Sequence, residues 1–422
     1  MTGLPMMVLP AQAADRIDDF GSSWGILDLR FDPHENLVVV AGSSRKQEVR
    51  YEERPAWAAD HYLRTQAIQS AGFWYRVDPP LHAMHRVLVA QRLSLRLEAL
   101  QASVHGGWRQ PPPDRQMPVL TLARTDAGLD WAAWWVNAQG AQPGLVHVVE
   151  NRPPLEFLGD TWPLGDLDDR LVTVIGVGSI GSIAADALAA FGVSRLALVD
   201  PDRLLEHNVV RHRLSMRDIG RHKVNAMAEQ LAASHPHLRV DTFPLDVIDD
   251  ADVMRPLLAR STAVLCTADG VAARRVVSHL ARRADVPAVL ACVLEDGAIG
   301  EVLRLRPGTG CLLCHRARLV ERGAFDPEPH LDRGYGTGTR HLPMTAVPGD
   351  LALVADLAAK ATVATILERA GHHNQRLPDD HAVIGLRPVP DLPVPFDVER
   401  AGDIRWGPVG PSRTGCPTCT PP

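Results

Sequence analysis

The sequence lacks the features of nucleic-acid-binding, secreted and membrane-spanning proteins. Its formal net charge is −6 and its pI is about 6.3, so no basic excess exists to neutralise phosphates, and we expect no nucleic-acid partner. The longest apolar stretch, Leu351 to Leu367, contains Asp356 and Lys360, whose spacing suits a buried or half-buried helix better than lipid. The opening residues MTGLPMMVLPAQAADR have no basic residue before their apolar patch, and prolines interrupt it, unlike a signal peptide. We therefore expect a cytoplasmic protein with no membrane partner.

Cysteine and aromatic residues are scarce and unevenly distributed. Only six of the 422 residues are cysteines, and none of them lies in the first 160 residues. Eight of the nine tryptophans and three of the four tyrosines lie in the first 162 residues. The rest of the composition, 45% hydrophobic and 22% charged, is typical of a globular protein with two or three domains. The shift in composition predicts two domains, residues 1–160 and residues 161–422.

Residues 1–160 have the pattern of a small α+β domain. Two apolar runs, Trp24 to Phe31 and Asn36 to Ala41, predict a β-hairpin, and the spacing of leucine and valine predicts one helix from His82 to His105. Strands are expected at Met117 to Leu122 and at Leu145 to Val149. The tryptophans have two interpretations, a packed core or exposed anchors for a peptide or small protein.

A strand, a glycine-rich turn, a helix and a second strand occupy Leu171 to Asp200. The turn contains Gly176, Gly178 and Gly181, and Asp200 ends the second strand. Glycines at this spacing let backbone approach a phosphate at a helix N-terminus, and an acid at the end of the next strand can bind a ribose. The stretch therefore predicts a nucleotide site.

Strands and helices continue to alternate after this unit. Strands are expected at residues 239–243, 263–266, 287–293 and 299–305, with helices at 223–234, 270–283 and 351–370. Such alternation predicts an α/β domain with a mostly parallel sheet, whose ligands bind at the carboxyl ends of the strands. Asp200 and Asp269 each follow a strand, so we expect both at that edge.

The residues after Asp200 favour a triphosphate over a dinucleotide. A lone G-x-G-x-x-G by default indicates a dehydrogenase. Asn208, Arg211 and Lys223, however, could stabilise the negative charge that develops on phosphate oxygens when a triphosphate is cleaved. Single residues of this stretch also have plain structural interpretations. Arg211 could pair with a surface acid, Lys223 could open an exposed helix, and Asp202, which follows Asp200 closely, could be only a turn residue. The combination behind one glycine loop favours the nucleotide interpretation.

Four of the six cysteines form two C-x-x-C pairs, Cys311 with Cys314 and Cys416 with Cys419. Two such pairs are consistent with tetrahedral zinc, but redox-active pairs or unrelated pairs are alternatives, because about a hundred residues separate them. His315 is either a substitute ligand or, in the plainer interpretation, a polar surface residue. The remaining two, Cys266 and Cys292, lie in apolar runs typical of buried strands.

Taken in order, the motifs GVGSIG, LVDPD, NVVRH and GRHK resemble the adenylating domain of the ThiF/MoeB and ubiquitin-activating enzyme family over about residues 165–422. The resemblance implies a Rossmann-like, mostly parallel sheet with helices on both faces, preceded here by the smaller α+β domain. It also implies roles for the candidate residues: Gly176, Gly178 and Gly181 near the nucleotide, Asp200 on the ribose, Asn208, Arg211 and Lys223 on the phosphates, and Asp269 beside the α-phosphate and Mg²⁺. Of these, Arg211, Lys223 and Asp269 are the catalytic candidates. A structural zinc held by Cys311, Cys314, Cys416 and Cys419 is implied in the same way.

The same resemblance implies a reaction and partners. ATP would adenylate the C-terminal carboxylate of a small ubiquitin-like protein or peptide, giving an acyl-AMP and pyrophosphate. A homodimer and a separate conjugating enzyme are further implied partners. Two alternatives remain open: a peptide-modifying adenylase of natural-product biosynthesis, and a non-catalytic scaffold that docks a leader peptide. An NAD-dependent oxidoreductase is a more distant one.

The sequence departs from the family pattern in three places. A crossing loop is expected at about residues 318–348, but it contains no cysteine to accept an acyl group and has Thr345 near that position. The expected Cys-Thr-Asp is Cys-Thr-Ala-Asp, ending at Asp269. The family also has an arginine-rich stretch ahead of the first strand that reaches a second subunit, but only Arg152 and Arg170 lie nearby here, and neither is in the expected motif. The missing loop cysteine puts covalent transfer in doubt and leaves adenylation untouched. Without a cysteine, residues 1–160 cannot be an active conjugating enzyme.

Overall fold

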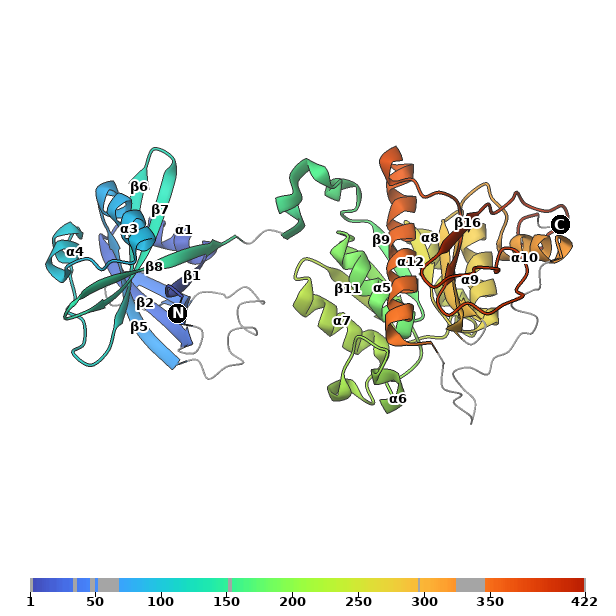
Figure 1. Ribbon diagram of the computed structural model, residues 1–422, viewed down its shortest axis with the longest axis horizontal. Coiled ribbons are helices and arrows are strands. Elements are labelled where there is room, and N and C mark those ends of the chain that lie inside the picture. Colours follow the sequence, from blue (N-terminus) through green and yellow to red (C-terminus); the bar gives the residue numbers. More distant parts are fainter. Residues whose placement is uncertain are drawn as a thin grey trace. The chain divides into compact units, whose positions relative to one another are not determined.

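A computed structural model describes residues 3–32, 36–45, 50–51, 68–150, 154–294, 297–323 and 346–420. Its internal contacts divide the chain into two compact units, Met1–Arg152 and Pro153–Pro422 (Figure 1). Each unit has its own buried hydrophobic clusters, so each can be understood by itself.

The first unit is built on one strongly curved sheet. Its strands follow the order β1-β8-β7-β6-β5-β2-β3-β4, and β1 also pairs with β3, which closes seven of them into a ring. The strands are β1 (Met6–Pro10), β2 (Trp24–Asp32), β3 (Leu37–Arg45), β4 (Arg50–Tyr51), β5 (Ile68–Arg76), β6 (Met117–Thr125), β7 (Gly128–Asn137) and β8 (Gly140–Val149).

Helices cover both faces of this sheet. Helix α1 (Ala11–Asp19) packs with one cluster of buried side chains, and α3 (Pro79–Gln91) and α4 (Leu97–Ser103) pack with the other. Three of the tryptophans, Trp74, Trp134 and Trp135, are buried in these clusters, and none of the described tryptophans is an exposed residue. The described tryptophans of this unit are therefore buried or half-buried against its core, as the first interpretation expects.

The expected hairpin is confirmed, but the single helix from His82 to His105 is wrong. Strands β2 and β3 pair antiparallel, whereas helix α3 stops at Gln91 because Arg92 adopts a left-handed conformation with φ of 56°. The apolar spacing continues past this break because α3 and α4 bury leucines in the same cluster. Periodicity alone does not distinguish one helix from two helices on one face.

The second unit is a mixed α/β domain with a sheet rich in parallel strands. The strands follow the order β11-β10-β9-β12-β13-β14-β15-β16, of which the first five are parallel and the last three are antiparallel additions. The strands are β9 (Leu171–Ile175), β10 (Arg195–Val199), β11 (Arg239–Phe243), β12 (Ala263–Cys266), β13 (Ala288–Leu294), β14 (Ile299–Leu305), β15 (His381–Gly385) and β16 (Ile404–Gly407). The expected parallel-rich sheet is confirmed.

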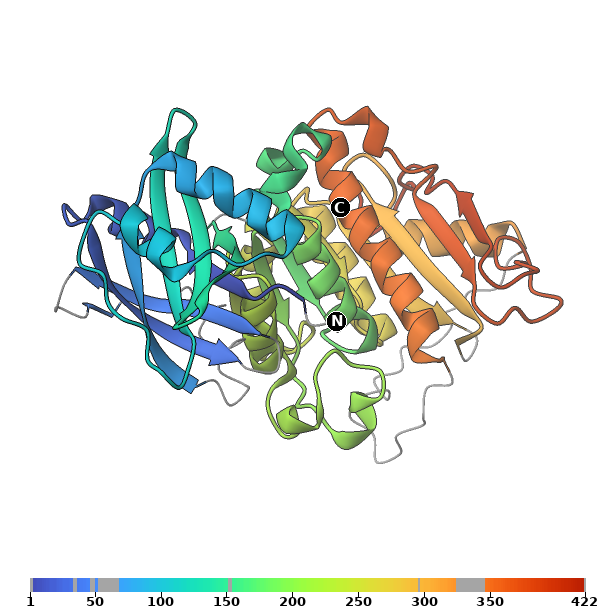
Figure 2. The same ribbon diagram turned by 60° about the vertical axis from the view of Figure 1, so that its left-hand side comes forward.

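Helices pack against both faces of this sheet. On one face, α5 (Ser179–Ala190), α7 (Lys223–Ser234) and α12 (Pro348–Arg369) share a large buried cluster, and Figure 2 shows the green α5 beside the orange α12. On the other face, α8 (Ala251–Arg260) and α9 (Val271–Arg283) share a second cluster. The shorter helices are α6 (Glu206–Val209), α10 (Leu312–Glu321), η1 (Pro154–Thr161), η2 (Leu164–Asp166), η3 (Met216–Asp218) and η5 (His373–Gln375).

This topology brings the turns after β9, β10, β11 and β12 to one edge of the sheet, because parallel strands all end on the same side. The nucleotide candidates lie in or after these turns. Most of the expected crossing loop, including Thr345, falls in residues 324–345, which lie outside the described residues. No helix among the described residues is long and apolar enough to cross a membrane.

Candidate nucleotide site

Glycine is required at two positions of the turn between β9 and α5. Gly176 has φ of +85°, and a Cβ there would lie 2.6 Å from the backbone nitrogen of Ala268. A Cβ at Gly181 would overlap the carbonyl oxygen of Gly176, which also accepts a hydrogen bond from the Thr267 hydroxyl. These two glycines therefore let the turn pack directly against the chain after β12.

Gly178 differs from the other two glycines. A Cβ at this position would meet no atom within 4 Å, and Gly178 lines the neighbouring cleft as the residue before helix α5. The first backbone N–H groups of a helix have no partner inside the helix and attract anions. Gly178 thus leaves the helix N-terminus accessible to a ligand.

We expect two alanine substitutions to separate these roles. Gly181→Ala should destabilise the protein by at least about 2 kcal/mol, since its methyl group collides with backbone that cannot move aside. Gly178→Ala should keep the wild-type unfolding midpoint but weaken nucleotide binding, because its methyl group enters the cleft. Thermal unfolding and calorimetric titration with ATP and Mg²⁺ measure both effects. A Gly181→Ala protein as stable as the wild type would contradict the packing.

The cleft has a volume of about 290 Å³ and brings together five of the expected residues, Gly176, Gly178, Asp200, Lys223 and Asp269. Three others, Gly181, Asn208 and Arg211, are not among the residues that line it. The loop after β11 contributes a wall that the sequence pattern did not indicate, with Asp246 and Asp249 among its residues.

Asp200 holds the glycine turn in place. Its Oδ2 accepts the Val177 backbone N–H at 2.7 Å, and its Oδ1 accepts that of Asp202 at 2.8 Å. Burial raises the pKa of Asp200, partly offset by the positive charge of Lys223. Each carboxylate oxygen retains a second lone pair, so Asp200 can bind the turn and still accept a hydrogen bond from a ligand.

Lys223 is a buried cation among carboxylates. It is 7% exposed, and its Nζ lies 2.8 Å from Asp202 Oδ2. Burial lowers the pKa of Lys223, but the charges of Asp200, Asp202 and Asp269 outweigh burial and leave the pKa raised. The ammonium group therefore stays charged at the edge of the cleft, where it can meet phosphate oxygens.

Asp269 and Arg211 lie on the same side of the site. Asp269 is exposed towards the cleft; desolvation by the surrounding walls raises its pKa, and the cations Arg274, Lys223 and Arg211 act in the opposite direction. The Nε of Arg211 is buried and has no hydrogen-bond partner among the described residues. A buried, unpartnered guanidinium nitrogen is costly, and an anionic ligand would relieve that cost.

Asn208 has a local partner instead of facing the cleft. Its Oδ1 accepts the Leu205 backbone N–H at 3.0 Å, which shapes the short helix α6. In this arrangement Asn208 supports the turn that precedes Arg211. Its expected contact with phosphate stays a prediction.

His212 is a positioning residue that the motif contained but to which no role was assigned. Its Nδ1 accepts the Leu214 N–H at 3.0 Å, so its Nε2 carries the proton and donates to the Val177 carbonyl at 2.7 Å. Burial lowers the pKa of His212 to about 4. The neutral ring therefore ties the segment of Arg211 to the glycine turn.

Replacing His212 should change the pH dependence of stability in a defined direction. The pKa of His212 is about 4 in the folded chain, against 6.5 for an ordinary histidine. The neutral ring therefore makes its full contribution to the free energy of unfolding above pH 6.5, and this contribution is lost as the pH falls towards 4. The wild-type advantage over His212→Gln in free energy of unfolding should shrink by about 2 kcal/mol between pH 7 and pH 5. Urea unfolding at both pH values measures it, and a constant difference would contradict the assignment.

The four paired cysteines meet at one point of the second unit. Their Sγ atoms all lie within 4.8 Å of one another, with separations of 3.8 Å for Cys311 and Cys314, 3.6 Å for Cys311 and Cys416, and 3.9 Å for Cys314 and Cys419. Four thiolates around one zinc ion, each about 2.3 Å from it, stand about 3.8 Å apart. The cluster fits a structural zinc that fixes the tail to helix α10.

His315 is neither a ligand of this cluster nor a surface residue. It is 3% exposed, and its ring contacts that of His381 edge to face, 4.6 Å between centroids. Burial lowers the pKa of His315 to about 3. The plainer expectation of a polar surface histidine is thus wrong, because the first turn of α10 faces the sheet and not solvent.

His315 and His381 lie beside Glu301, and the three could in principle hold a metal ion. Glu301 is already occupied: it accepts both terminal nitrogens of Arg316, and Oε1 also pairs with His381 Nε2 at 2.8 Å. The charge of Arg316 helps to hold the pKa of Glu301 well below its usual range in spite of burial. The cluster is therefore a buried ion pair that joins α10 to the sheet.

Comparison with known proteins gives relatives for the second unit. The curated relatives include ubiquitin-like modifier-activating enzyme 5 of Drosophila virilis, 27% identical over 157 residues, which are 35% of this chain and 39% of that protein. Molybdopterin-synthase adenylyltransferase of Salmonella typhimurium is 30% identical over 149 residues, 35% of this chain and 59% of that protein. The matches thus span less than two thirds of these relatives. Among solved structures, E. coli MccB with ATP has a TM-score of 0.45 at 20% identity, covering 61% of this chain and 68% of that chain.

One protein-family model matches a larger part of the chain than either curated relative does. The model of the ThiF family matches residues 160–376, which are 217 of the 422 residues. This range includes the glycine turn, the candidate phosphate residues and the first cysteine pair. The chain belongs to the ThiF family.

Proposed function

We propose that this protein uses ATP and Mg²⁺ to adenylate the C-terminal carboxylate of a small protein or peptide. The carboxylate oxygen attacks the α-phosphorus of ATP, the bond from that phosphorus to the bridging oxygen breaks, and pyrophosphate leaves with the electron pair. The product is an acyl adenylate, which turns a poor electrophile into a reactive one. The names of the two curated relatives, an activating enzyme and an adenylyltransferase, support this class of reaction.

The observation that carries the proposal is the charge arrangement of one cleft. A glycine turn at a helix N-terminus, a buried carboxylate at Asp200 and a buried ammonium at Lys223 line the same cavity. Together they offer backbone donors, a ribose acceptor and a cation. We propose that this arrangement binds ATP in the Rossmann-like manner that the family resemblance implies.

Two cations would stabilise the charge that develops on the phosphates. Lys223 is fixed by Asp202, and Arg211 has a buried Nε with no partner among the described residues. Cations already in position cost no reorganisation when charge develops in the transition state. We assign Lys223 and Arg211 to the phosphates on these grounds.

The carboxylates at the cleft fit a magnesium ion. Asp269 is exposed towards the cleft, and the side chain of Asp202 is 44% exposed. Mg²⁺ prefers carboxylate, phosphate and water oxygens, so Asp269 and Asp202 are the residues that would hold it. When bound, the ion neutralises charge on the phosphates of ATP.

The substrate and partners follow from the same proposal. The adenylated group is the C-terminal carboxylate of a small ubiquitin-like protein or a peptide. We propose a homodimer, with a separate conjugating enzyme as the acceptor. The unit of residues 1–152 would then dock the peptide or protein. Without a cysteine in the expected crossing loop, transfer to a thiol of this chain is not part of the proposal.

ATP–pyrophosphate exchange tests the proposed function. Purified protein with Mg²⁺ is assayed with and without small proteins and peptides encoded beside its gene. Exchange that depends on one of these partners would support activation of its carboxylate, and a partner with a peptide-antibiotic precursor sequence would favour the natural-product alternative. ATP binding without exchange with any candidate would favour a docking scaffold. Binding of NAD in place of ATP would overturn the proposal.

A further inference from the structure

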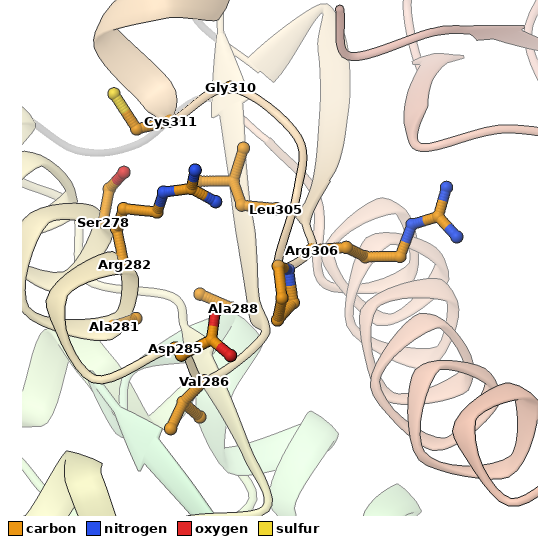
Figure 3. A pocket seen from close by; sticks show the side chains of 11 residues that line it. Ser278, Ala281, Arg282, Asp285, Val286, Ala288, Leu305, Arg306, Gly310 and Cys311 are labelled. Atoms are coloured by element: carbon orange, nitrogen blue, oxygen red, sulfur yellow. The ribbon is translucent and has the colours of Figure 1, made fainter. Parts of the chain in front are cut away.

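Helix α9 is basic along its whole length in a chain whose net charge is −6. Its thirteen residues, VAARRVVSHLARR, include four arginines, one histidine and no acid. Two of the arginines point to the protein itself: Arg274 donates to the carbonyls of Ala268 and Asp269, and Arg282 donates to the Ser412 hydroxyl at 3.2 Å. Figure 3 shows Arg282 within a small pocket near Cys311.

Two basic residues of α9, His279 and Arg283, lie about one turn apart on the same side of the helix, about 6 Å along its axis. His279 and Arg283 are exposed, and both line a groove of about 550 Å³ between α8, α9 and the C-terminal tail.

The groove has a second basic wall and a fixed end. Arg255 of α8 lines it from the opposite side, and Pro417 of the tail closes it. The Nδ1 of His279 lies 3.2 Å from the Thr418 hydroxyl, so the tail between Cys416 and Cys419 is joined to the helix. The cysteine cluster therefore holds one wall of the groove in position.

No acidic side chain lines this groove. The nearest acids along the sequence, Asp252 and Asp285, form no ion pair with Arg255 or Arg283, and within the described part of the chain no other carboxylate does so. Among the described residues, Arg255 and Arg283 therefore have no carboxylate partner.

We propose that the groove between α8 and α9 binds an acidic segment of a protein partner. An extended chain advances about 3.4 Å per residue, so the distance of about 6 Å between the α-carbons of His279 and Arg283 along the helix matches about two residues. Two arginines on opposite walls can each bind a carboxylate with two parallel hydrogen bonds. A nucleic acid fits less well, because the negative charge of the whole chain repels a long polyanion.

The groove is separate from the nucleotide cleft but shares a helix with it. Ala272 and Ala273 at the start of α9 line the cleft, whereas His279 and Arg283 line the groove. At 1.5 Å per residue the two sites lie roughly 10 to 15 Å apart along the helix. A partner held in the groove is thus brought close to the nucleotide without touching it, and its binding does not require adenylation.

Fluorescence anisotropy of the full chain with a fluorescein-labelled octaglutamate peptide tests this site. We expect binding at 50 mM NaCl that weakens at 300 mM, and at least about tenfold weaker binding by the double variant Arg255→Glu, Arg283→Glu. Arg369→Glu, an exposed arginine in the last turn of α12 on the opposite face of the sheet, should bind within twofold of the wild type. ATP binding of both proteins should be unchanged, which separates this result from a failure of the proposed function.

The control probes for octaglutamate are a neutral glycine–serine octapeptide and an eight-nucleotide DNA strand. If the charge-reversed protein unfolds at a lower temperature, Arg255→Gln with Arg283→Gln replaces it. Absence of octaglutamate binding at 50 mM NaCl would overturn the proposal. So would an equal loss of binding in Arg369→Glu, or tighter binding of the DNA strand than of the peptide.

Discussion

Replacing Lys223 by alanine should lower the rate of ATP–pyrophosphate exchange by about 10²- to 10³-fold. The ammonium group is surrounded by the carboxylates of Asp200, Asp202 and Asp269 and is the cation that lines the cleft beside them. Without it, three negative groups face the phosphates, so the substitution removes an attraction and exposes a repulsion. We expect ATP binding to weaken as well, which calorimetric titration would separate from the loss in rate.

Arg221→Ala is the matched control for Lys223→Ala. Arg221 lies two residues earlier, but it pairs with Asp218 and Glu229 away from the cleft, so its loss should leave the exchange rate within about twofold of the wild type. Lys223→Arg keeps the charge in a larger group and should retain more activity than the alanine variant. Equal activity of Lys223→Ala and wild type, with both proteins folded, would remove Lys223 from the site.

Replacing Cys416 by serine should remove the zinc ion and detach the C-terminal tail. We expect bound zinc to fall from one ion per chain to none, and the unfolding midpoint to fall by about 10 °C, since zinc binding contributes several kcal/mol to folding. The tail also loses its fixed position at α10, where the Arg413 N–H lies 3.3 Å from Cys314 Sγ. Metal analysis by mass spectrometry and thermal unfolding measure the two effects.

Cys266→Ala is the control, because Cys266 is buried in β12 outside the cluster. It should keep its zinc and lose only about 1 kcal/mol of stability. The same experiment decides between the interpretations of the cysteine pairs. A protein without zinc that carries a disulfide between Cys311 and Cys314 under cytoplasmic redox conditions would favour a redox pair.

Much of the second unit was predictable because its signals are local. The alternation of strands and helices predicted the bounds of β11, β12, β14 and α7 to the residue. Strand β12 is apolar on both faces because helices cover both, and that pattern needs no knowledge of distant segments. The glycine turn was predictable for the same reason, because its signal lies in a few consecutive residues.

The first unit was predicted less well for the converse reason. The strands β5 and β7 were not anticipated, and Trp131, Trp134 and Trp135 all lie on β7. Aromatic residues are enriched in strands, but the residues of β7, GLDWAAWWVN, do not alternate strictly between apolar and polar, so they gave no period to follow. The sheet closes through the pairing of β1 with β3 and β8, contacts between segments that are far apart along the chain.

The sequence alone determined which residues are available for chemistry: the glycine turn, Asp200, Lys223 and Asp269 in this order, and two pairs of cysteines. The tertiary structure decided how they act together. It placed Lys223 against Asp202, left the Nε of Arg211 unpartnered among the described residues, and joined His212 to the turn. It also brought the cysteine pairs within bonding distance of one ion, although about a hundred residues separate them. These relations depend on contacts between distant segments, and sequence spacing contains no information on such contacts.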